Sequence, residues 1–175
     1  MTSQSILLNI LRFFFLIFFQ VLILNNINLG GYINPLFYVY FILLLPFNTP
    51  RWLLLVLSFF LGLGIDLFTN TPGLNAASCV VMAFFRPFVI TLISSGPESL
   101  IGESPALKNQ GLKWFLYYSM ILVLIHHLFL FYLEIFRFNE FFRTLVRALF
   151  SSAFTLFLIF LSQYFFSPRE KEKTR

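Results

Sequence analysis

The residue best placed to do chemistry in this sequence is Asp66, a carboxylic acid at the end of a long hydrophobic run. A carboxylate at membrane depth is costly, and it usually binds a cation or relays a proton. A structural role is the alternative, because the acid is followed by the turn Pro72-Gly73 and by Asn75, which opens the next hydrophobic run. We favour an acid that accepts hydrogen bonds from the turn, from Asn75 and from backbone N–H groups at the start of the next helix.

Two histidines and a second acid form the next candidate group. His127 and Glu134 share one face of a helix, whereas His126 points about 100° away from His127. Their spacing matches no HExxH-type metal site, and we expect neither a metal nor a cofactor. We predict polar contacts inside a helical bundle, with a proton path as the alternative. Glu134 alternatively forms an ion pair with Arg137 at the membrane interface.

The patterns typical of intramembrane enzymes are missing from the sequence. It has no G-x-S-x-G segment, no paired aspartate motif and no serine with a convincing histidine partner. The single cysteine, Cys79, excludes an internal disulfide and a cysteine-based metal cluster. No basic stripe with interleaved aromatic residues lies outside the hydrophobic runs, so nucleic acid is a poor candidate for a partner. We therefore predict no catalytic residues and a protein that is not an enzyme.

The composition indicates which elements must position these side chains. Of the 175 residues, 59% are hydrophobic, 21% are aromatic and only 11% are charged, which is too much apolar surface for a soluble domain of this length. The long runs do not alternate as barrel strands would, so the bilayer is crossed by helices. We predict an all-α polytopic membrane protein with about six transmembrane helices in one bundle, at residues 6–24, 35–47, 52–68, 74–95, 113–136 and 144–166.

The second of these runs is the shortest. Pro46 and Pro50 interrupt it, and the uninterrupted part is too short to cross upright at about 1.5 Å per residue. We favour a short span over a re-entrant segment, because six spans place both termini on one side. In the fourth run, Arg86 lies about 18 Å along the helix from Leu74, near the opposite face of the membrane from Asp66. A direct pair between Asp66 and Arg86 is therefore not expected.

The distribution of basic residues predicts the orientation. Cytoplasmic loops of membrane proteins carry an excess of lysine and arginine. The side that contains both termini holds the basic residues Arg51, Lys108, Lys113, Arg169, Lys171, Lys173 and Arg175, whereas the other side holds Arg137, Arg143 and Arg147. We predict cytoplasmic termini, with residues 169–175 forming a basic cytoplasmic tail.

The corner around Asp66 also resembles a known family. Its sequence, Gly62-Leu63-Gly64-Ile65-Asp66-Leu67-Phe68 through Pro72-Gly73-Leu74-Asn75-Ala76, is similar to the Gly-x-x-x-Asp-Leu…Gly-x-Asn-Ala segment of MreD, the family of rod shape-determining membrane proteins. The pair Arg86-Pro87, the chain length and the basic tail fit the same family. The layout matches over most of the chain, but the detailed match is confined to this corner.

This resemblance implies a fold similar to the six-helix substrate-binding subunits (S components) of energy-coupling-factor (ECF) transporters. It also implies a non-enzymatic scaffold in the bacterial inner membrane, within the rod complex or elongasome. The expected partner is an MreC-like single-span protein, acting with MreB, RodZ, RodA and a transpeptidase to regulate cell shape and lateral peptidoglycan synthesis. The alternative is a substrate-binding membrane subunit of a vitamin-type transporter. Association of copies of the chain with one another stays open.

Overall fold

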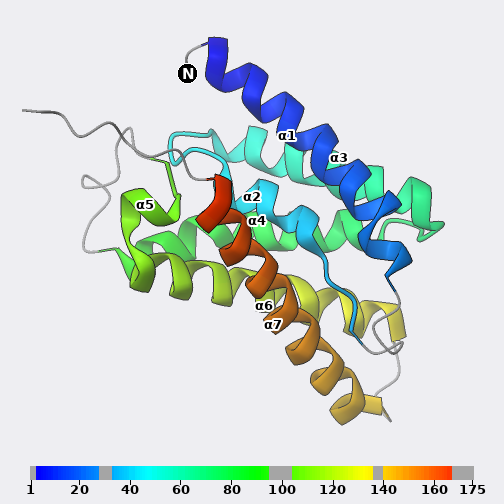
Figure 1. Cartoon of the computed structure of the whole chain (residues 1–175). Helices are drawn as coiled ribbons and strands as arrows, with labels where there is room; N and C mark the ends of the chain where they lie inside the picture. The colour runs from blue at the N-terminus through cyan, green and yellow to red at the C-terminus, as the bar shows by residue number, and fades with distance from the viewer. Residues whose placement is uncertain (1–2, 28–32, 95–103, 136–139, 167–175) are drawn as a thin grey trace, which may run out of the picture.

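The structure is a computed structural model, which describes residues 3–27, 33–94, 104–135 and 140–166. Every secondary-structure element in these ranges is a helix, as predicted (Figure 1). The elements are α1 (Ser3–Leu22), η1 (Leu24–Asn26), η2 (Phe37–Val39), α2 (Tyr40–Leu44), α3 (Arg51–Thr69), α4 (Leu74–Ile93), α5 (Leu107–Gln110), α6 (Leu112–Ile135) and α7 (Phe141–Phe166). Residues 169–175, predicted to form the basic tail, lie outside the described residues, as does Arg137.

Five segments in the described part of the chain are long and apolar enough to cross a membrane, with mean hydropathies from 1.8 to 2.4. By length and composition, these segments support the predicted polytopic membrane protein. The helix boundaries agree with the predicted runs to within a few residues, although α7 begins at Phe141 rather than at Thr144. The short helix α5 was not predicted, because it lies in a stretch that reads as a loop.

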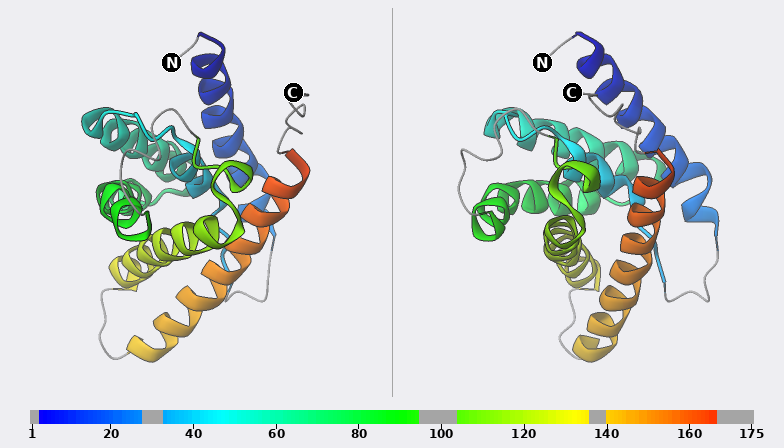
Figure 2. Two further views of the ribbon diagram at one scale, coloured as in Figure 1. Left: turned by 90° about the vertical axis from the view of Figure 1, so that its left-hand side faces the viewer. Right: turned by 60° about the vertical axis from the view of Figure 1, so that its left-hand side comes forward.

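Each long helix packs against at least one other long helix, and together they surround one core. Helix α3 packs against α4, α4 against α6, α6 against α7, and α1 against α3. Successive segments run back and forth between two ends of the bundle, so the start of α1 and the end of α7 lie toward the same end (Figures 1 and 2). The apolar outer faces stay exposed, as they must in a protein whose solvent is lipid.

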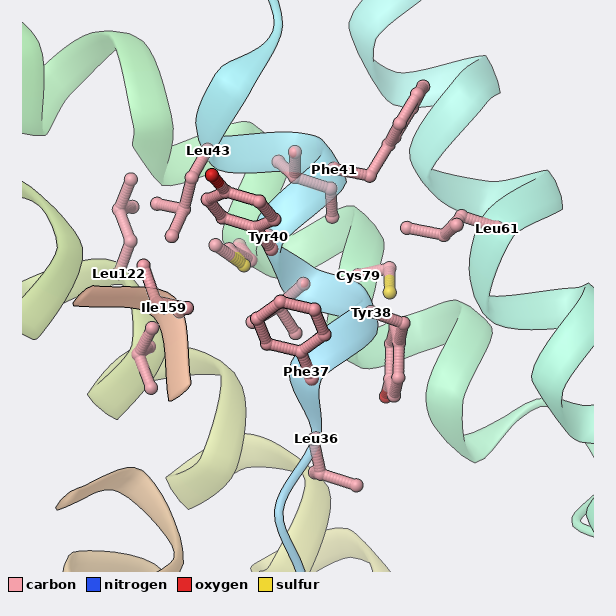
Figure 3. Close-up of a cluster of buried hydrophobic side chains, with 14 of the residues drawn as sticks. Leu36, Phe37, Tyr38, Tyr40, Phe41, Leu43, Leu61, Cys79, Leu122 and Ile159 are labelled. Atoms are coloured by element: carbon pink, nitrogen blue, oxygen red, sulfur yellow. The ribbon is translucent and has the colours of Figure 1, made fainter. Parts of the chain in front are cut away.

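The middle of the bundle is filled by residues 36–45, which we call the central segment. All ten of its residues are buried. Its side chains point toward several of the surrounding helices: Phe41 points toward Leu61 of α3, and Leu43 points toward Leu122 of α6 (Figure 3). The central segment therefore forms the core that the long helices enclose.

The predicted helix over residues 35–47 is wrong in its extent. The helical part of the central segment is η2 followed by α2, from Phe37 to Leu44, or about 12 Å at 1.5 Å per residue. Pro46 explains where it ends, because a proline disfavours helical geometry in the residue before it. Leu45 accordingly has an extended ψ of 137°.

Candidate functional site: the polar network of the bundle

Asp66 is the most heavily hydrogen-bonded side chain in the described structure. Its Oδ1 accepts hydrogen bonds from the Thr71 hydroxyl at 2.6 Å, the Asn75 backbone N–H at 3.0 Å and the Asn75 side-chain amide at 2.9 Å. Its Oδ2 accepts one from the backbone N–H of Ala76 at 2.9 Å. The side chain is almost completely buried. The carboxylate therefore accepts four hydrogen bonds, all from the chain that carries it.

The turn places Asp66 where the cap of the next helix would be. Gly73 occupies the N-cap position of α4 with φ of 81°, a left-handed conformation that glycine adopts without strain, and it has no side chain to cap the helix. Asn75 and Ala76 are the second and third residues of α4, whose N–H groups an N-cap side chain normally binds. Asp66 binds both from the end of α3, where the positive end of the α4 dipole also favours its charge.

The two glycines of the corner have different neighbours. A Cβ added to Gly62 would lie 2.5 Å from the backbone nitrogen of Ala76, so the backbones of α3 and α4 touch here. A Cβ added to Gly64 would lie 2.9 Å from Cδ1 of Ile17, the end of a flexible side chain of α1. Gly62 therefore sets how closely the two helices of the corner approach, and Gly64 faces the contact with α1.

The corner is connected to His126 through the central segment. The Tyr38 hydroxyl donates to Asn75 Oδ1 at 2.7 Å and lies 3.2 Å from Nε2 of His126. Because the tyrosine hydrogen is used on Asn75, the tyrosine oxygen accepts from His126, which assigns the Nε2–H tautomer to this histidine. Cys79 Sγ lies 3.8 Å from the same nitrogen. Within the described residues, Nδ1 of His126 has no hydrogen-bond partner.

His127 faces a different part of the bundle and has the other tautomer. Its Nδ1 lies 2.9 Å from the carbonyl oxygen of Val123, which only accepts, so Nδ1 carries the proton. Its Nε2 then accepts from the Thr155 hydroxyl at 3.1 Å. Thr155 in turn accepts the backbone N–H of Leu36 at 3.0 Å. The predicted polar contacts inside the bundle are therefore present for both histidines, but they belong to two separate groups.

Arg86 binds the C-terminal end of the central segment. Its Nε donates to the Tyr118 hydroxyl at 2.7 Å, and its guanidinium also donates to the carbonyl oxygen of Leu45. The Tyr118 hydroxyl donates to the carbonyl oxygen of Leu43 at 3.0 Å. A cation at a helix C-terminus is favourable, because it meets orphaned carbonyls and the negative end of the dipole. Arg86 and Asp66 have separate sets of partners, as the helical rise predicted.

The N-terminal end of the central segment is held by side chains that sequence reasoning did not select. Gln20 accepts the backbone N–H of Phe37 at 2.8 Å and donates to the carbonyl oxygen of Pro35 at 2.9 Å. Ser151 accepts the N–H of Asn34 at 3.0 Å. One signal could have identified the α7 residues: small or polar side chains recur on one face of the sixth run, at Ser151, Thr155 and Gln163.

Glu134 lies apart from the histidines. Its carboxylate forms an ion pair with Arg147 of α7 at 3.1 Å, with both side chains partly exposed. The guanidinium of Arg147 also lies 4.4 Å from the ring centroid of Phe131, which is favourable cation–π geometry. The alternative partner predicted for Glu134, Arg137, is outside the described residues. Glu134 therefore joins α6 to α7 and takes no part in the network around Asp66.

The polar side chains described above join neighbouring helices and bind both ends of the central segment. Among the described residues, no group of three or more His, Cys, Asp or Glu side chains is placed to hold a metal ion. The polar side chains satisfy the helix termini and the ends of the central segment, which the bilayer interior requires. Comparison with models of protein families, with curated proteins and with solved structures found no match to this chain.

Proposed function

We propose that this protein is a non-enzymatic scaffold of the MreD type in the bacterial inner membrane. In this role it binds an MreC-like single-span partner and, with the other rod-complex proteins, regulates cell shape and lateral peptidoglycan synthesis. The residues that carry the resemblance support this proposal through their structural roles. Gly62 permits the close contact of α3 and α4, and Asp66 caps α4.

The observation that carries the proposal is the hydrogen bonding of Asp66. Three of these hydrogen bonds converge on Oδ1 and one is on Oδ2, and all four donors belong to the turn and to the first residues of α4. Donors from its own chain therefore bind both oxygens of Asp66, which favours a structural corner over a site of chemistry.

We propose six passes through the membrane, with the central segment and its flanking residues as the second pass. The alternation of chain direction between the two ends of the bundle supports this count (Figure 1). The excess of basic residues on the side of the start of α1 supports cytoplasmic termini. The large exposed aromatic side chains on the outer faces offer surfaces to partner helices, among them Phe60, Phe88, Phe150 and Phe157.

The alternative function, a vitamin-binding transporter subunit, calls for a polar cavity among the helices. The central segment fills the middle of the bundle with buried side chains. In the described part of the chain, grooves of about 680 and 370 Å³ lie along α1, and neither is lined by Asp66, His126 or His127. Polar ligands need convergent polar groups, and the linings of these grooves are mostly apolar. The scaffold is the better-supported function.

Depletion in a rod-shaped bacterial host that carries this gene tests the proposal. We expect depleted cells to become round, and expression of the wild-type chain to restore the rods. The tagged chain is expected to recover an MreC-like single-span protein from detergent-solubilised membranes. Cells that keep their shape, together with a tagged chain that recovers no such partner, would contradict the scaffold function. Saturable binding of a vitamin by the purified chain would support the alternative.

A further inference from the structure

A groove runs between α1 and α7 beside the central segment. Its volume is about 680 Å³, within the range of small-molecule sites. Phe37 of η2 and Tyr40 of α2 contribute to its lining, and the two long helices form its sides. The exposed side chains of Leu8 and Phe15 on α1, and of Phe165 on α7, lie at its edges. The groove is therefore apolar and open toward the lipid.

One cation lies in this apolar lining. Arg12 of α1 is partly buried in the groove, about 9 Å along the helix from Ile6, where the apolar run begins. Its described hydrogen-bond partner is the neutral side-chain oxygen of Asn9, at 3.2 Å. Among the described residues, no acidic side chain forms an ion pair with Arg12. A charge at this depth that the described residues do not neutralise is costly, so it favours an anionic ligand.

Two neutral polar side chains line the same groove as Arg12. Ser162 of α7 contributes a hydroxyl, and Tyr40 contributes a phenol that accepts a hydrogen bond from Gln163 at 2.6 Å. Ser162 and Tyr40 also hydrogen-bond to each other, so one hydroxyl hydrogen of the pair is left to donate to an anion. The groove therefore combines one cation, two hydroxyl groups and a long apolar wall.

We propose that this groove binds one anionic phospholipid, with its phosphate on Arg12 and an acyl chain along the walls formed by α1 and α7. An apolar partner helix would cover the walls of the groove but leave the charge of Arg12 unneutralised. An anionic lipid covers the walls with its acyl chain and neutralises Arg12 with its phosphate. Arg12 lies near the start of α1, on the side we propose to be cytoplasmic, and anionic lipids of the cytoplasmic leaflet attract basic groups there. The lipid closes the side of the bundle where α1 and α7 flank the central segment.

Native mass spectrometry of the full chain, released from lipid nanodiscs of mixed phosphatidylglycerol and phosphatidylcholine, tests this proposal. We expect one phosphatidylglycerol to be retained per chain, with a preference on the order of tenfold over phosphatidylcholine, because phosphatidylglycerol is a net anion whereas the choline of phosphatidylcholine neutralises its phosphate. Arg12→Gln is expected to remove the preference. The matched control is Arg51→Gln, which removes an exposed cation at the start of α3, outside the groove, and is expected to keep it.

A second variant separates lipid binding from a loss of folding. Ser162→Phe keeps Arg12 and fills the groove, so it is expected to reduce lipid retention while the thermal unfolding temperature in detergent stays near that of the wild type. Equal preference in the wild type and Arg12→Gln would overturn the proposal, as would an equal loss in Arg12→Gln and Arg51→Gln. Displacement of the lipid by excess inorganic phosphate would indicate a site for a free anion. Displacement by a partner's transmembrane helix that contains an acid would indicate a protein interface.

Discussion

Asp66 caps a helix to which it does not belong: its Oδ2 accepts the backbone N–H of Ala76, the third residue of α4, at 2.9 Å. The same carboxylate binds the second residue of that helix, Asn75, through both the backbone and the side chain. Asp66 therefore lies in the last turn of α3, and its carboxylate caps the N-terminus of α4. This relationship explains how a buried acid is retained without an ion pair to any described basic residue, because its charge is met by aligned N–H donors.

Substitution of Asp66 separates its role as an acceptor from its charge. Asp66→Asn keeps one oxygen for the donors at Oδ1 but turns an N–H group toward Ala76, whereas Asp66→Leu leaves the backbone N–H groups of Asn75 and Ala76 without their acceptor. We expect Asn to lower the free energy of unfolding by about 1–3 kcal/mol, and Leu to lower it by more. Unfolding of the purified variants in detergent measures this order. If both variants stay folded and both lose partner binding completely, the role of Asp66 depends on its charge.

The two glycines of α3 form a matched pair. Gly62→Ala forces the α3 and α4 backbones apart, so we expect clear destabilisation. Gly64→Ala meets only the end of the Ile17 side chain, and it gains up to about 1 kcal/mol of helix propensity, so we expect it to be near neutral. Melting temperatures in detergent compare the two. Equal melting temperatures would show that the corner does not depend on the close contact at Gly62.

Arg86 and Tyr118 are expected to act as one unit. Both bind carbonyl oxygens at the end of the central segment, and they bind each other. Arg86→Met and Tyr118→Phe are each expected to destabilise the protein by about 1–3 kcal/mol, because each leaves a buried polar group unpaired. The double variant is expected to cost less than the sum of the two. Additive losses in a double-mutant cycle would show that the two side chains stabilise the segment independently.

The adjacent histidines are expected to have opposite tautomers. ¹⁵N-histidine spectra of the protein in micelles at neutral pH should show one ring protonated at Nε2, which is His126, and one protonated at Nδ1, which is His127. Tyr38→Phe removes the partner of His126 and is expected to shift only that signal. Thr155→Val serves as the corresponding control for His127. Two identical tautomers in the wild type would contradict the assigned hydrogen-bond directions.

The corner could be predicted from the sequence because its interactions are local. Asp66 binds residues at most ten positions away, and the capping rules for helix termini apply directly to such a turn. The lengths of the hydrophobic runs located the long helices to within a few residues. The absence of a pair between Asp66 and Arg86 also followed from the helical rise alone.

The central segment could not be predicted, for two physical reasons. Its partners are distant in sequence: Leu36 binds Thr155, and Tyr38 binds His126. In addition, a residue that faces lipid and a residue that faces the protein core are both apolar, so hydropathy does not distinguish a helix at the periphery from a segment at the centre. The two prolines indicated a short element, but not that it would be enclosed.

The recovery of an MreC-like partner from membranes tests the central claim, a structural scaffold, most directly. The tagged wild-type chain and its Gly64→Ala variant are expected to recover this partner in comparable, near-stoichiometric amounts, and Gly62→Ala to recover less. The result that would contradict the scaffold function is a wild-type chain that restores rod shape in depleted cells but recovers no more of the partner than an untagged control.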